Sequence, residues 1–396
     1  MEDFKKEIQK RINKVPISGG WTRKIGKISF DNLVFVPAQL AKRPIDYYRE
    51  RISSKTIVGK FSKKPLEIET PIVIGAMSFG ALSKEAKIAL AKGAKIAQTL
   101  TNTGEGGMLP EEREETKYLI IQYSTGRFGI EERVLKKADA IEIKIGQGGK
   151  PGMGGFLPKE KVTKEIARIR KVPLKKDIFS PAYHQDIKSI EDLKRKVKWL
   201  RKITKGVPII IKLAAGEVEK DVKLAVKANC DIIAIDGMEG ATGAAPEVMI
   251  EEVGIPTLTA LVKARETLDK IGAKQELWIG GGLRKGGEVA KALALGADCV
   301  FMGTSMLIAM GCLSCKLCYL GKCPVGLATQ DYRLRKRLDV ERAAKNVAGF
   351  IKNCTEEIKM IAGACGENNI HNLNKKHLRA LTLETAKITK VKFIGE

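Results

Sequence analysis

The chain has 396 residues, of which 44% are hydrophobic and 5% aromatic, so it can bury the core of one large domain with extensions or of two ordinary domains. It carries 71 Lys and Arg against 46 Asp and Glu, a net charge of +25 that indicates a lysine-rich surface or an acidic partner. No apolar run reaches membrane-spanning length and the N-terminus lacks a secretory pattern, so we expect a cytoplasmic protein.

Short apolar, β-branched runs alternate with amphipathic segments, which predicts alternating strands and helices. The eight expected strands are Pro71–Phe79, Leu100–Gly104, Tyr118–Tyr123, Ala140–Gly146, Pro208–Ala214, Asp231–Gly237, Glu276–Gly282 and Cys299–Ser305. Ser189 and Glu191 have the residue types that begin a helix. Eight such repeats predict an α/β fold, a (β/α)8 TIM barrel. An open doubly wound sheet is the alternative, but no Gly-x-Gly-x-x-Gly motif follows the first strand.

Other segments lie outside this alternation. We expect an N-terminal extension over residues 1–65, the barrel over 66–310, a cysteine loop over 311–330 and a C-terminal helical segment over 331–396, whose helices would cover one end of the barrel. The extension is basic and interrupted by prolines. A long insertion, Gln147–Lys188, follows the fourth strand, and a loop of that length in a compact domain is usually functional or disordered.

Four cysteines lie within twelve residues of the cysteine loop: Cys312, Cys315, Cys318 and Cys323. Soft thiolates bind iron and zinc, and clustered cysteines in a chain without a secretory pattern favour a metal over disulfides. Zinc usually takes two separated Cys-x-x-Cys pairs, whereas all four cysteines here share one loop without a nearby His, and Pro324 follows the last of them. The spacing therefore favours an iron–sulfur cluster and a redox protein.

In a barrel of this class the active site lies at the carboxyl ends of the strands. The first strand ends at Met77 and Ser78, the second continues into Glu105, and the fourth is followed by Gln147 and Lys150. Lys212 lies near the end of the fifth strand. A lysine there would face an anionic or electron-rich group, such as the reduced ring of a flavin, unless it only caps the strand with its ammonium in solvent.

The loops after the last three strands are rich in glycine, which lets backbone N–H groups approach an anion closely. Their candidate ligand-binding residues are Asp236, Gly243, Gly281, Gly282, Gly303 and Thr304. The late strands of such barrels commonly bind the phosphate of a cofactor or substrate. We therefore expect a phosphate-binding site formed by these loops.

The segments GAMSFGALSKEA, TNTGEGG, STGRFGI, EIKIGQGGKPGMGG, DGMEGATGA and GGLRKGGEVAKALALGAD, together with the cysteine loop, occur in unbroken order between about residues 65 and 355. In these motifs the chain resembles the FMN-binding domain of glutamate synthase. The resemblance implies a barrel that binds FMN and a three-iron, four-sulfur cluster and that reduces 2-iminoglutarate, formed from 2-oxoglutarate and ammonia, to glutamate.

The resemblance also implies roles for individual residues. Cys312, Cys318 and Cys323 would ligate the cluster, and Lys150 and Arg170 would bind the carboxylates of the oxo acid, with Glu105 near the imine. FMN contacts fall on Met77, Ser78, Gln147, Lys212, Asp236, Gly243, Gly281, Gly282, Gly303 and Thr304. From the sequence alone, Arg170 could instead be a solvated residue on a basic helix face.

The sequence departs from the family pattern in four ways. Its start at Met1 offers no cysteine nucleophile, so ammonia would come from solution or from a separate glutaminase subunit. Cys315 is an additional thiol, which makes a four-iron cluster a second option. Phe156 replaces a polar substrate contact, and Gln185 stands where a second His is common. These last two changes raise the question of whether 2-oxoglutarate is the substrate.

Three alternatives remain at the level of sequence. One is another FMN enzyme on the same barrel, although such families do not explain the cysteine loop. Another is an electron-transfer subunit of a larger complex, which would not need Lys150 or Glu105. The third is nucleic-acid binding, which the dispersed basic residues do not favour. Because no dinucleotide fingerprint is present, we expect an acidic electron donor such as ferredoxin, and the sequence leaves homo-oligomer formation open.

Overall fold

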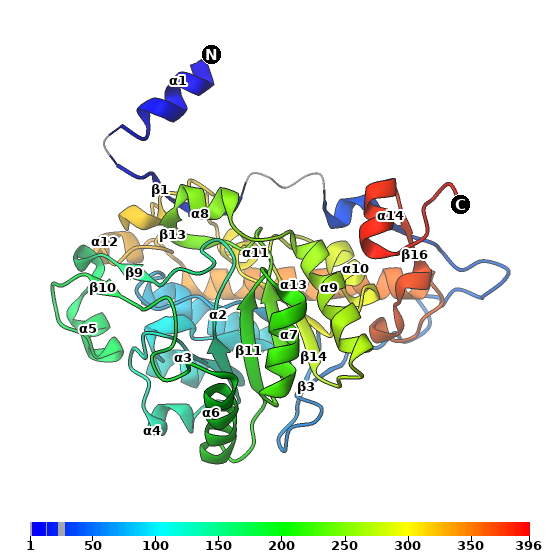
Figure 1. Ribbon diagram of the computed structural model, residues 1–396, viewed down its shortest axis with the longest axis horizontal. Helices are drawn as coiled ribbons and strands as arrows, with labels where there is room; N and C mark the ends of the chain where they lie inside the picture. Colours follow the sequence, from blue (N-terminus) through cyan, green and yellow to red (C-terminus); the bar gives the residue numbers. More distant parts are fainter. Residues whose placement is uncertain (1, 13, 23–27) are drawn as a thin grey trace.

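The computed structural model describes residues 2–12, 14–22 and 28–396. Its central feature is a barrel of eight parallel strands (Figure 1). These are β5 (Ile72–Ile74), β6 (Leu100–Asn102), β7 (Tyr118–Tyr123), β8 (Ala140–Lys144), β11 (Ile209–Ala214), β12 (Ile232–Asp236), β14 (Glu276–Gly280) and β15 (Cys299–Met302). Each lies within one of the expected ranges, and their order, β5-β15-β14-β12-β11-β8-β7-β6, confirms the (β/α)8 barrel and excludes the doubly wound sheet.

Helices connect the strands and cover the outside of the barrel. They are α2 (Lys84–Ala97), α3 (Pro110–Glu115), α4 (Glu132–Leu135), α6 (Ile190–Ile203), α7 (Val218–Lys227), α9 (Thr257–Lys270) and α10 (Gly286–Ala294). The short α8 (Glu247–Glu252) lies in the loop after β12 and contacts β13, and α11 (Thr304–Ala309) and α12 (Tyr332–Arg335) follow the last strand. The expected start of α6 is confirmed, because the Ser189 side chain accepts a hydrogen bond from the backbone N–H of Asp192 at 3.2 Å.

The C-terminal segment differs from the expectation that its helices cover one end of the barrel. Its long helix α13 (Val340–Ala364) packs along α2 and α10 on the side of the barrel. Its Ala343, Val347 and Ile351 are buried, so an apolar stripe faces the barrel. Because α10 follows the seventh strand and α2 follows the first, α13 fills the place of the eighth barrel helix. The shorter α14 (Leu383–Thr389) packs against α9.

The barrel interior is closed at its amino end. The hairpin of β3 (Thr56–Val58) and β4 (Leu66–Ile68) places Val58 and Ile68 in one apolar cluster with residues from the barrel strands. Trp278 and Phe301 are part of this cluster, with their rings edge to face at 5.2 Å between centroids. Since this half of the barrel is packed solid, ligand space is left at the carboxyl ends of the strands.

The N-terminal extension is built into the fold by short elements. After α1 (Glu2–Gln9), β1 (Ile17–Gly20) pairs with β13 (Thr242–Pro246), which lies in the loop after β12. Further along, β2 (Leu33–Phe35) pairs with β16 (Leu378–Ala380) near the C-terminus. The expectation that rested on Met1 lies outside the described residues. The extension thus contacts the barrel at both ends, through β1 at the carboxyl end and through β3 at the amino end.

The insertion after β8 is folded. It contains the two-stranded pairing of β9 (Phe156–Leu157) with β10 (Ile178–Phe179), and α5 (Lys164–Arg170), whose N-cap is Thr163. The short 3-10 helices of the chain are η1 (Phe30–Asn32), η2 (Gly104–Gly106), η3 (Lys159–Lys161), η4 (Cys318–Leu320), η5 (Ile370–Asn372) and η6 (Lys375–His377). The insertion is therefore folded rather than disordered, as a functional loop would be.

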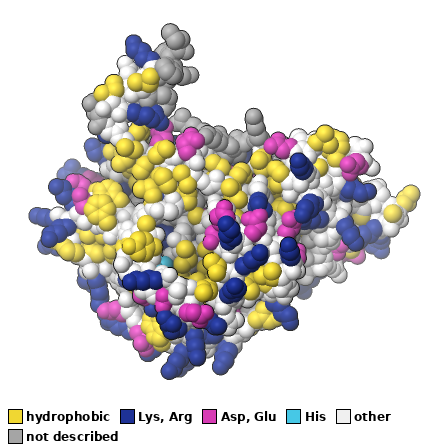
Figure 2. Space-filling view, in the orientation of Figure 1, with side chains coloured by type: hydrophobic (Ala, Val, Ile, Leu, Met, Phe, Trp, Pro, Cys, Tyr) yellow, Lys and Arg dark blue, Asp and Glu magenta, His cyan; other side chains and the backbone are white. Residues whose placement is uncertain are grey.

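The surface shows how the excess of basic residues is distributed. Figure 2 shows Lys and Arg side chains spread over this face with Asp and Glu between them, and hydrophobic side chains gathered towards the upper left. No single basic stripe of the kind that tracks a nucleic-acid backbone stands out on this face. Among the described residues, no helix combines the length and apolarity needed to cross a membrane.

Candidate active site

One large cavity of about 880 Å³ opens at the carboxyl ends of the barrel strands. This volume lies within the usual range of pockets that bind cofactors and small molecules. The residues that were expected to bind FMN and substrate all line it: Met77, Ser78, Glu105, Gln147, Lys150, Arg170, Lys212, Asp236, Gly243, Gly281, Gly282, Gly303 and Thr304. The fold therefore brings residues from the ends of seven strands and the loops that follow them together around a single space.

Lys212 lies inside the barrel mouth rather than in solvent. It is 5% exposed, its Nζ lies 3.2 Å from Oδ2 of Asp236 on the neighbouring strand, and it sits 5.0 Å above the Phe301 ring. Burial would lower the pKa of Lys212, but the charges of Asp236 and Glu142 outweigh burial and raise it. The alternative of a solvated strand cap is therefore excluded, and the ammonium contributes a fixed positive charge to the cavity.

The glycine-rich loops leave room for a ligand. A Cβ atom at Gly243 or Gly303 would meet no other atom within 4 Å, although both residues line the cavity. Gly281 has φ +123° and Gly282 has φ +72°, so the loop after β14 depends on glycine for its path. The start of α10 is already closed, because the backbone N–H of Gly286 donates to Glu357 at 2.7 Å. The room for a ligand therefore lies at the glycines of these loops rather than at the start of α10.

A group of charged side chains forms the opposite wall of the cavity. Glu105 Oε2 lies 3.0 Å from Lys144 Nζ, and the ammonium of Lys150 and the guanidinium of Arg170 lie near the same carboxylate. Burial would raise the pKa of Glu105, but Lys144 and Lys150 outweigh it and lower the pKa to about 2. Three cations thus surround one carboxylate, which leaves the wall with an excess of positive charge.

Lys150 is the cation of this group that no protein group neutralises directly. Among the described residues its ammonium has no hydrogen-bond or ion-pair partner, although it lines the cavity. Burial, with a contribution from Lys144, lowers the pKa of Lys150 to about 8, and Glu105 only partly opposes this. A half-buried ammonium without a partner is a site for an anion.

Arg170 is buried, so the interpretation as a solvated helix-face residue is wrong. It is 4% exposed, and its Nε donates to the Phe79 carbonyl oxygen at 3.0 Å. A Cβ at Gly80 would lie 2.9 Å from its Nη2 atom, so the loop after β5 needs glycine to admit the guanidinium. Burial lowers the pKa of Arg170 to about 10, and the side chain stays charged at neutral pH.

The position of Glu105 is fixed from several sides. Its backbone N–H donates to Ser78 Oγ at 3.2 Å, and its carboxylate holds Lys144. A side chain at Gly155 would collide with the Glu105 carboxylate, so the insertion needs glycine at this position to pack against it. Glu105 is therefore held between the first strand's loop, β8 and the insertion.

The sequence did not single out two contributors to this cavity. Lys144 ends β8 in register with Lys212 on β11, and both interrupt otherwise apolar strands, which is the signal that could have identified it. The N-terminal extension was expected to lie outside the barrel, yet Ile17, Trp21 and Phe30 line the cavity. No local motif marks these three residues, because their place depends on the pairing of β1 with β13.

The four cysteines border a second, small cavity of about 20 Å³ beside the first. Cys323 is buried, Cys312 and Cys318 are half-buried and also line the main cavity, and Cys315 is exposed. In the described part of the chain, no three or more His, Cys, Asp or Glu side chains form a group that could hold a metal ion. The donor types fit an iron–sulfur cluster, whereas their arrangement is not that of a preformed metal site.

Comparison with known proteins places this cavity in a family. A family model for the conserved region in glutamate synthase matches residues 28–368. The chain belongs to the glutamate synthase family. A glutamate synthase large subunit-like protein of Rhizobium meliloti is 41% identical over 92% of this chain and 87% of its own length. An archaeal glutamate synthase [NADPH] of Methanocaldococcus jannaschii is 39% identical over 98% of this chain and 83% of its own.

More distant matches are consistent with this assignment. The large chain of glutamate synthase [NADPH] of Bacillus subtilis is 35% identical over 77% of this chain, which corresponds to 21% of that larger protein. Among solved structures, a mandelate oxidase variant with an FMN adduct superposes with a TM-score of 0.57, covering 94% of this chain and 98% of the oxidase. At 15% identity this likeness shows a shared barrel fold.

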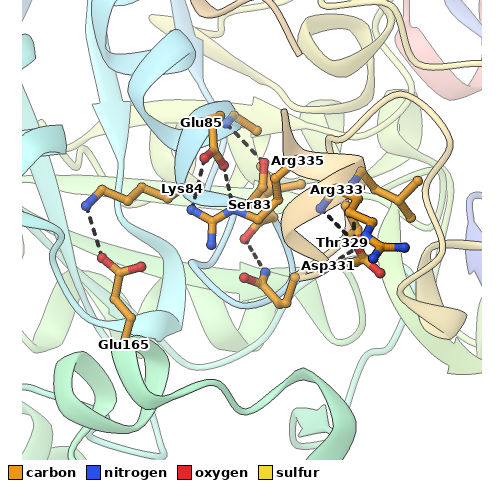
Figure 3. Close-up of polar contacts among 12 residues, drawn as sticks. Ser83, Lys84, Glu85, Glu165, Thr329, Asp331, Arg333 and Arg335 are labelled. Carbon is orange, nitrogen blue, oxygen red and sulfur yellow. Dashed lines mark hydrogen bonds and ion pairs between the residues drawn. The ribbon is translucent and has the colours of Figure 1, made fainter. Parts of the chain in front are cut away.

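In this glutamate synthase family member the segment after the cysteines is tied to the start of α2 (Figure 3). The guanidinium of Arg335 binds the Glu85 carboxylate with both Nε, at 2.6 Å, and Nη2, at 3.0 Å. Nε2 of Gln330 donates to the Leu82 carbonyl at 2.9 Å. Lys84, beside Glu85, pairs with Glu165 of α5 at 3.0 Å. The cysteine loop, the first strand's loop and the insertion thus meet at one helix start.

Phe156 and Gln185 lie in different places. Phe156 lines the cavity at its mouth and stacks on Phe179 with 5.0 Å between ring centroids. Gln185 is exposed and does not line the cavity, so it carries no argument about the substrate. The neighbouring His184 is buried and its Nε2 lies 2.8 Å from the Lys144 carbonyl oxygen, which is a structural role. Of the two, only Phe156 lines the cavity.

Proposed function

We propose that this protein is an FMN- and iron–sulfur-dependent oxidoreductase that reduces 2-iminoglutarate, formed from 2-oxoglutarate and ammonia, to glutamate. The observation that carries this proposal is the pairing, in one cavity of a glutamate synthase family barrel, of an open glycine-lined end with a wall of three cations around Glu105. One end suits the phosphate of a cofactor and the other suits a small dicarboxylate.

The residues that would hold FMN are those at the glycine-lined end of the cavity. Gly281, Gly282, Gly303 and Thr304 would surround the phosphate. The remaining members of the proposed set are Met77, Ser78, Gln147, Lys212, Asp236 and Gly243. FMN, when bound, supplies the two electrons of the reduction. The ammonium of Lys212, which Asp236 holds in the cavity, would favour the reduced, anionic form of the flavin.

The oxo acid would bind through Lys150 and Arg170. The free ammonium of Lys150 can pair with one carboxylate, and Arg170 retains N–H groups beyond those that bind the Phe79 carbonyl. The net excess of positive charge on this wall matches a dianion. The walls that exclude water include Phe128, Leu157 and Ile178 beside these cations.

Glu105 would hold and move the proton that the nitrogen of the substrate exchanges. It is the carboxylate that lines the cavity among three cations, and its low pKa keeps it ionised at neutral pH, so it acts first as an acceptor. Lys144 keeps the carboxylate in place. Ammonia would reach this point from solution or from a separate glutaminase subunit.

The cysteine loop would supply an iron–sulfur cluster through Cys312, Cys318 and Cys323. Cys312 and Cys318 border both cavities, so the loop adjoins the proposed FMN site directly. Electrons would come from a separate acidic carrier such as ferredoxin, because the chain has no dinucleotide fingerprint. These features favour a catalytic role over that of an electron-transfer subunit, since Lys150 and Glu105 form a small-acid site.

The test is to photoreduce the purified protein without oxygen and to follow flavin reoxidation with a panel of 2-oxo acids, each with and without ammonium. Reoxidation by 2-oxoglutarate that depends on ammonium is expected. The panel includes 2-oxo acids with apolar side chains, because Phe156 lines the cavity mouth. Faster reoxidation by a 2-oxo acid with an apolar side chain would show that this acid, and not 2-oxoglutarate, is the substrate. No reoxidation by any member of the panel would refute the proposed reaction class.

Binding of 2-oxoglutarate without ammonium is expected to weaken as pH rises through about 8, by about tenfold per pH unit above that value. The pKa of Lys150 is lowered, so its ammonium is present below about 8 and is lost above it. Titrations that follow the flavin absorbance from pH 6 to 10 measure this. The Lys150→Met variant should bind weakly at every pH, and a wild-type affinity that ignores pH would contradict the role of Lys150.

Replacement Lys212→Met is expected to weaken FMN binding by about 10- to 100-fold, because it removes a buried charge that favours an anionic ligand and leaves Asp236 unpaired. Fluorescence titration of the apoprotein with FMN measures the effect. The Lys212→Met/Asp236→Asn double variant controls for the unpaired carboxylate, and should remain weak. Wild-type affinity in both variants would remove Lys212 from the FMN site.

The wild-type protein is expected to hold a three-iron cluster, and Cys315→Ser is expected to leave its electron paramagnetic resonance signal unchanged. The reason is that Cys315 is exposed, whereas the other three cysteines are buried or half-buried around the small cavity. A four-iron signal in the wild type that becomes a three-iron signal in Cys315→Ser would show that Cys315 is a ligand. Purified protein with zinc and without iron would refute the cluster itself.

A further inference from the structure

The barrel has one seam where the backbone ladder is interrupted. Strands β5 and β6 are in contact, but among the described residues no ladder pairs them, whereas each other neighbouring pair of barrel strands is hydrogen-bonded. At the amino end of the seam the Thr99 hydroxyl donates to the Ile72 carbonyl at 2.6 Å. At the carboxyl end of the seam, the loop after β5 carries Ser78 and the loop after β6 carries Glu105. No strand hydrogen bonds join these two loops, so other contacts must hold them together.

A single buried side chain crosses the seam at that end. Lys87 of α2 is 0% exposed, and its Nζ donates to the carbonyl oxygen of Met77 at 2.7 Å and to that of Asn102 at 2.9 Å. The Thr103 carbonyl lies 3.3 Å away. Met77 follows β5, Asn102 ends β6 and Thr103 follows it, so one ammonium joins the ends of two strands that no ladder connects.

Glu112 of α3 completes the site. Its Oε1 lies 2.7 Å from Lys87 Nζ, and both side chains are 0% exposed. Apart from this ion pair, the carboxylate oxygens accept no other side-chain hydrogen bond within the described residues. Replacing a buried ion pair by apolar residues is often neutral or stabilising, so the pair is poorly explained as a source of global stability. The contacts of Lys87 with the ends of β5 and β6 indicate that the pair acts locally, on these two loops.

The loops that Lys87 joins are the loops that place Glu105. Asn102 Oδ1 accepts the backbone N–H of Gly104 at 2.9 Å, and Ser78 Oγ accepts that of Glu105 at 3.2 Å. A Cβ at Gly104 would lie 2.6 Å from the Ser78 nitrogen, so the two loops are in direct contact. Loss of the Lys87–Glu112 pair would therefore separate Ser78 from Glu105 before it affected Lys150, which is carried by the insertion and has no hydrogen bond to these loops among the described residues.

We propose that Lys87, held by Glu112, is a positioning residue that closes the β5–β6 seam and fixes Ser78 and Glu105 in the active site. The effect on turnover rests on the proposed function, whereas the closure of the seam does not. The two parts can therefore fail separately, and each has its own measurement.

The first measurement is amide hydrogen exchange of the purified full chain. In the Lys87→Met/Glu112→Leu double variant, which leaves no unpaired buried charge, exchange in residues 75–80 and 100–107 is expected to be about tenfold faster, with strands β11 and β12 unchanged. Lys95→Met, an exposed lysine of the same helix, should change neither region. If the double variant does not fold, Glu112→Gln should give a smaller effect in the same residues. Unchanged exchange, or equal acceleration throughout the barrel, would overturn the proposal.

The second measurement separates positioning from substrate binding. In the double variant kcat is expected to fall by about 10- to 100-fold while KM for the oxo acid changes less, because Glu105 is displaced and Lys150, which binds a carboxylate, is not. A rise in KM with unchanged kcat would contradict the assignment to Glu105. If the chain proves inactive towards every oxo acid, the proposed function fails, and the exchange result still decides whether Lys87 closes the seam.

Discussion

Glu105→Gln is expected to lower kcat for the amination of 2-oxoglutarate by about 10²- to 10⁴-fold, the usual contribution of a positioned proton donor or acceptor. Gln keeps the size of the side chain but cannot exchange a proton. KM for the oxo acid should change much less, because Lys150 and Arg170 lie on the insertion. Steady-state kinetics under anaerobic conditions, with a photoreductant regenerated continuously by illumination, measure both constants.

The pH dependence adds a second check on Glu105. Because its pKa is lowered to about 2, the carboxylate is ionised from pH 4 upwards, and no loss of kcat/KM between pH 7 and pH 5 should arise from its protonation. Glu111→Gln is the matched control, since Glu111 lies six residues away and pairs with Lys84 outside the cavity. It should keep wild-type kinetics. A Glu105→Gln enzyme with near-normal kcat would remove Glu105 from proton transfer.

The sequence was sufficient for the barrel because its evidence is local and repeated. Buried parallel strands are apolar along their length, so all eight were located from the sequence pattern. Six of them were extended one to five residues too far at the carboxyl end, and three were begun one residue too early. Strand ends also define the active site of a barrel, which is why Lys212 and Glu105 could be placed there before the structure. The missing hydrogen bonds between β5 and β6 could not be predicted in this way, because the composition of a strand does not determine which strand it pairs with.

Parts of the site that depend on long-range packing could not be predicted. Trp21 reaches the cavity only because β1 pairs with β13, more than two hundred residues away. The eighth barrel helix, α13, follows the cysteine loop instead of the last strand, so its amphipathic pattern was interpreted as an end cover. Arg170 was ambiguous for the same reason, since a basic helix of solvated residues and one that buries a single guanidinium have the same composition.

Electron delivery by an acidic carrier such as ferredoxin is expected to slow by about 10- to 10³-fold between low and high ionic strength, because a net charge of +25 steers an anionic partner over long range. The point of contact would be the cysteine loop, where Leu313, Leu317 and Leu320 are exposed. Stopped-flow reduction of the anaerobic protein across a salt series measures the effect. An uncharged photoreductant is the control and should show no salt dependence.

A matched pair of charge reversals separates a local docking site from the overall charge. Lys322→Glu changes an exposed lysine beside the leucines of the cysteine loop, and Lys223→Glu makes the same change on α7. If the carrier docks at the cysteine loop, Lys322→Glu should lower the association rate several-fold more than Lys223→Glu, since only the first places a negative charge in the contact. Equal effects of the two reversals would mean that the overall charge, and not a local docking site, attracts the carrier. A rate that does not depend on salt, or efficient reduction by NADPH alone, would contradict the acidic carrier.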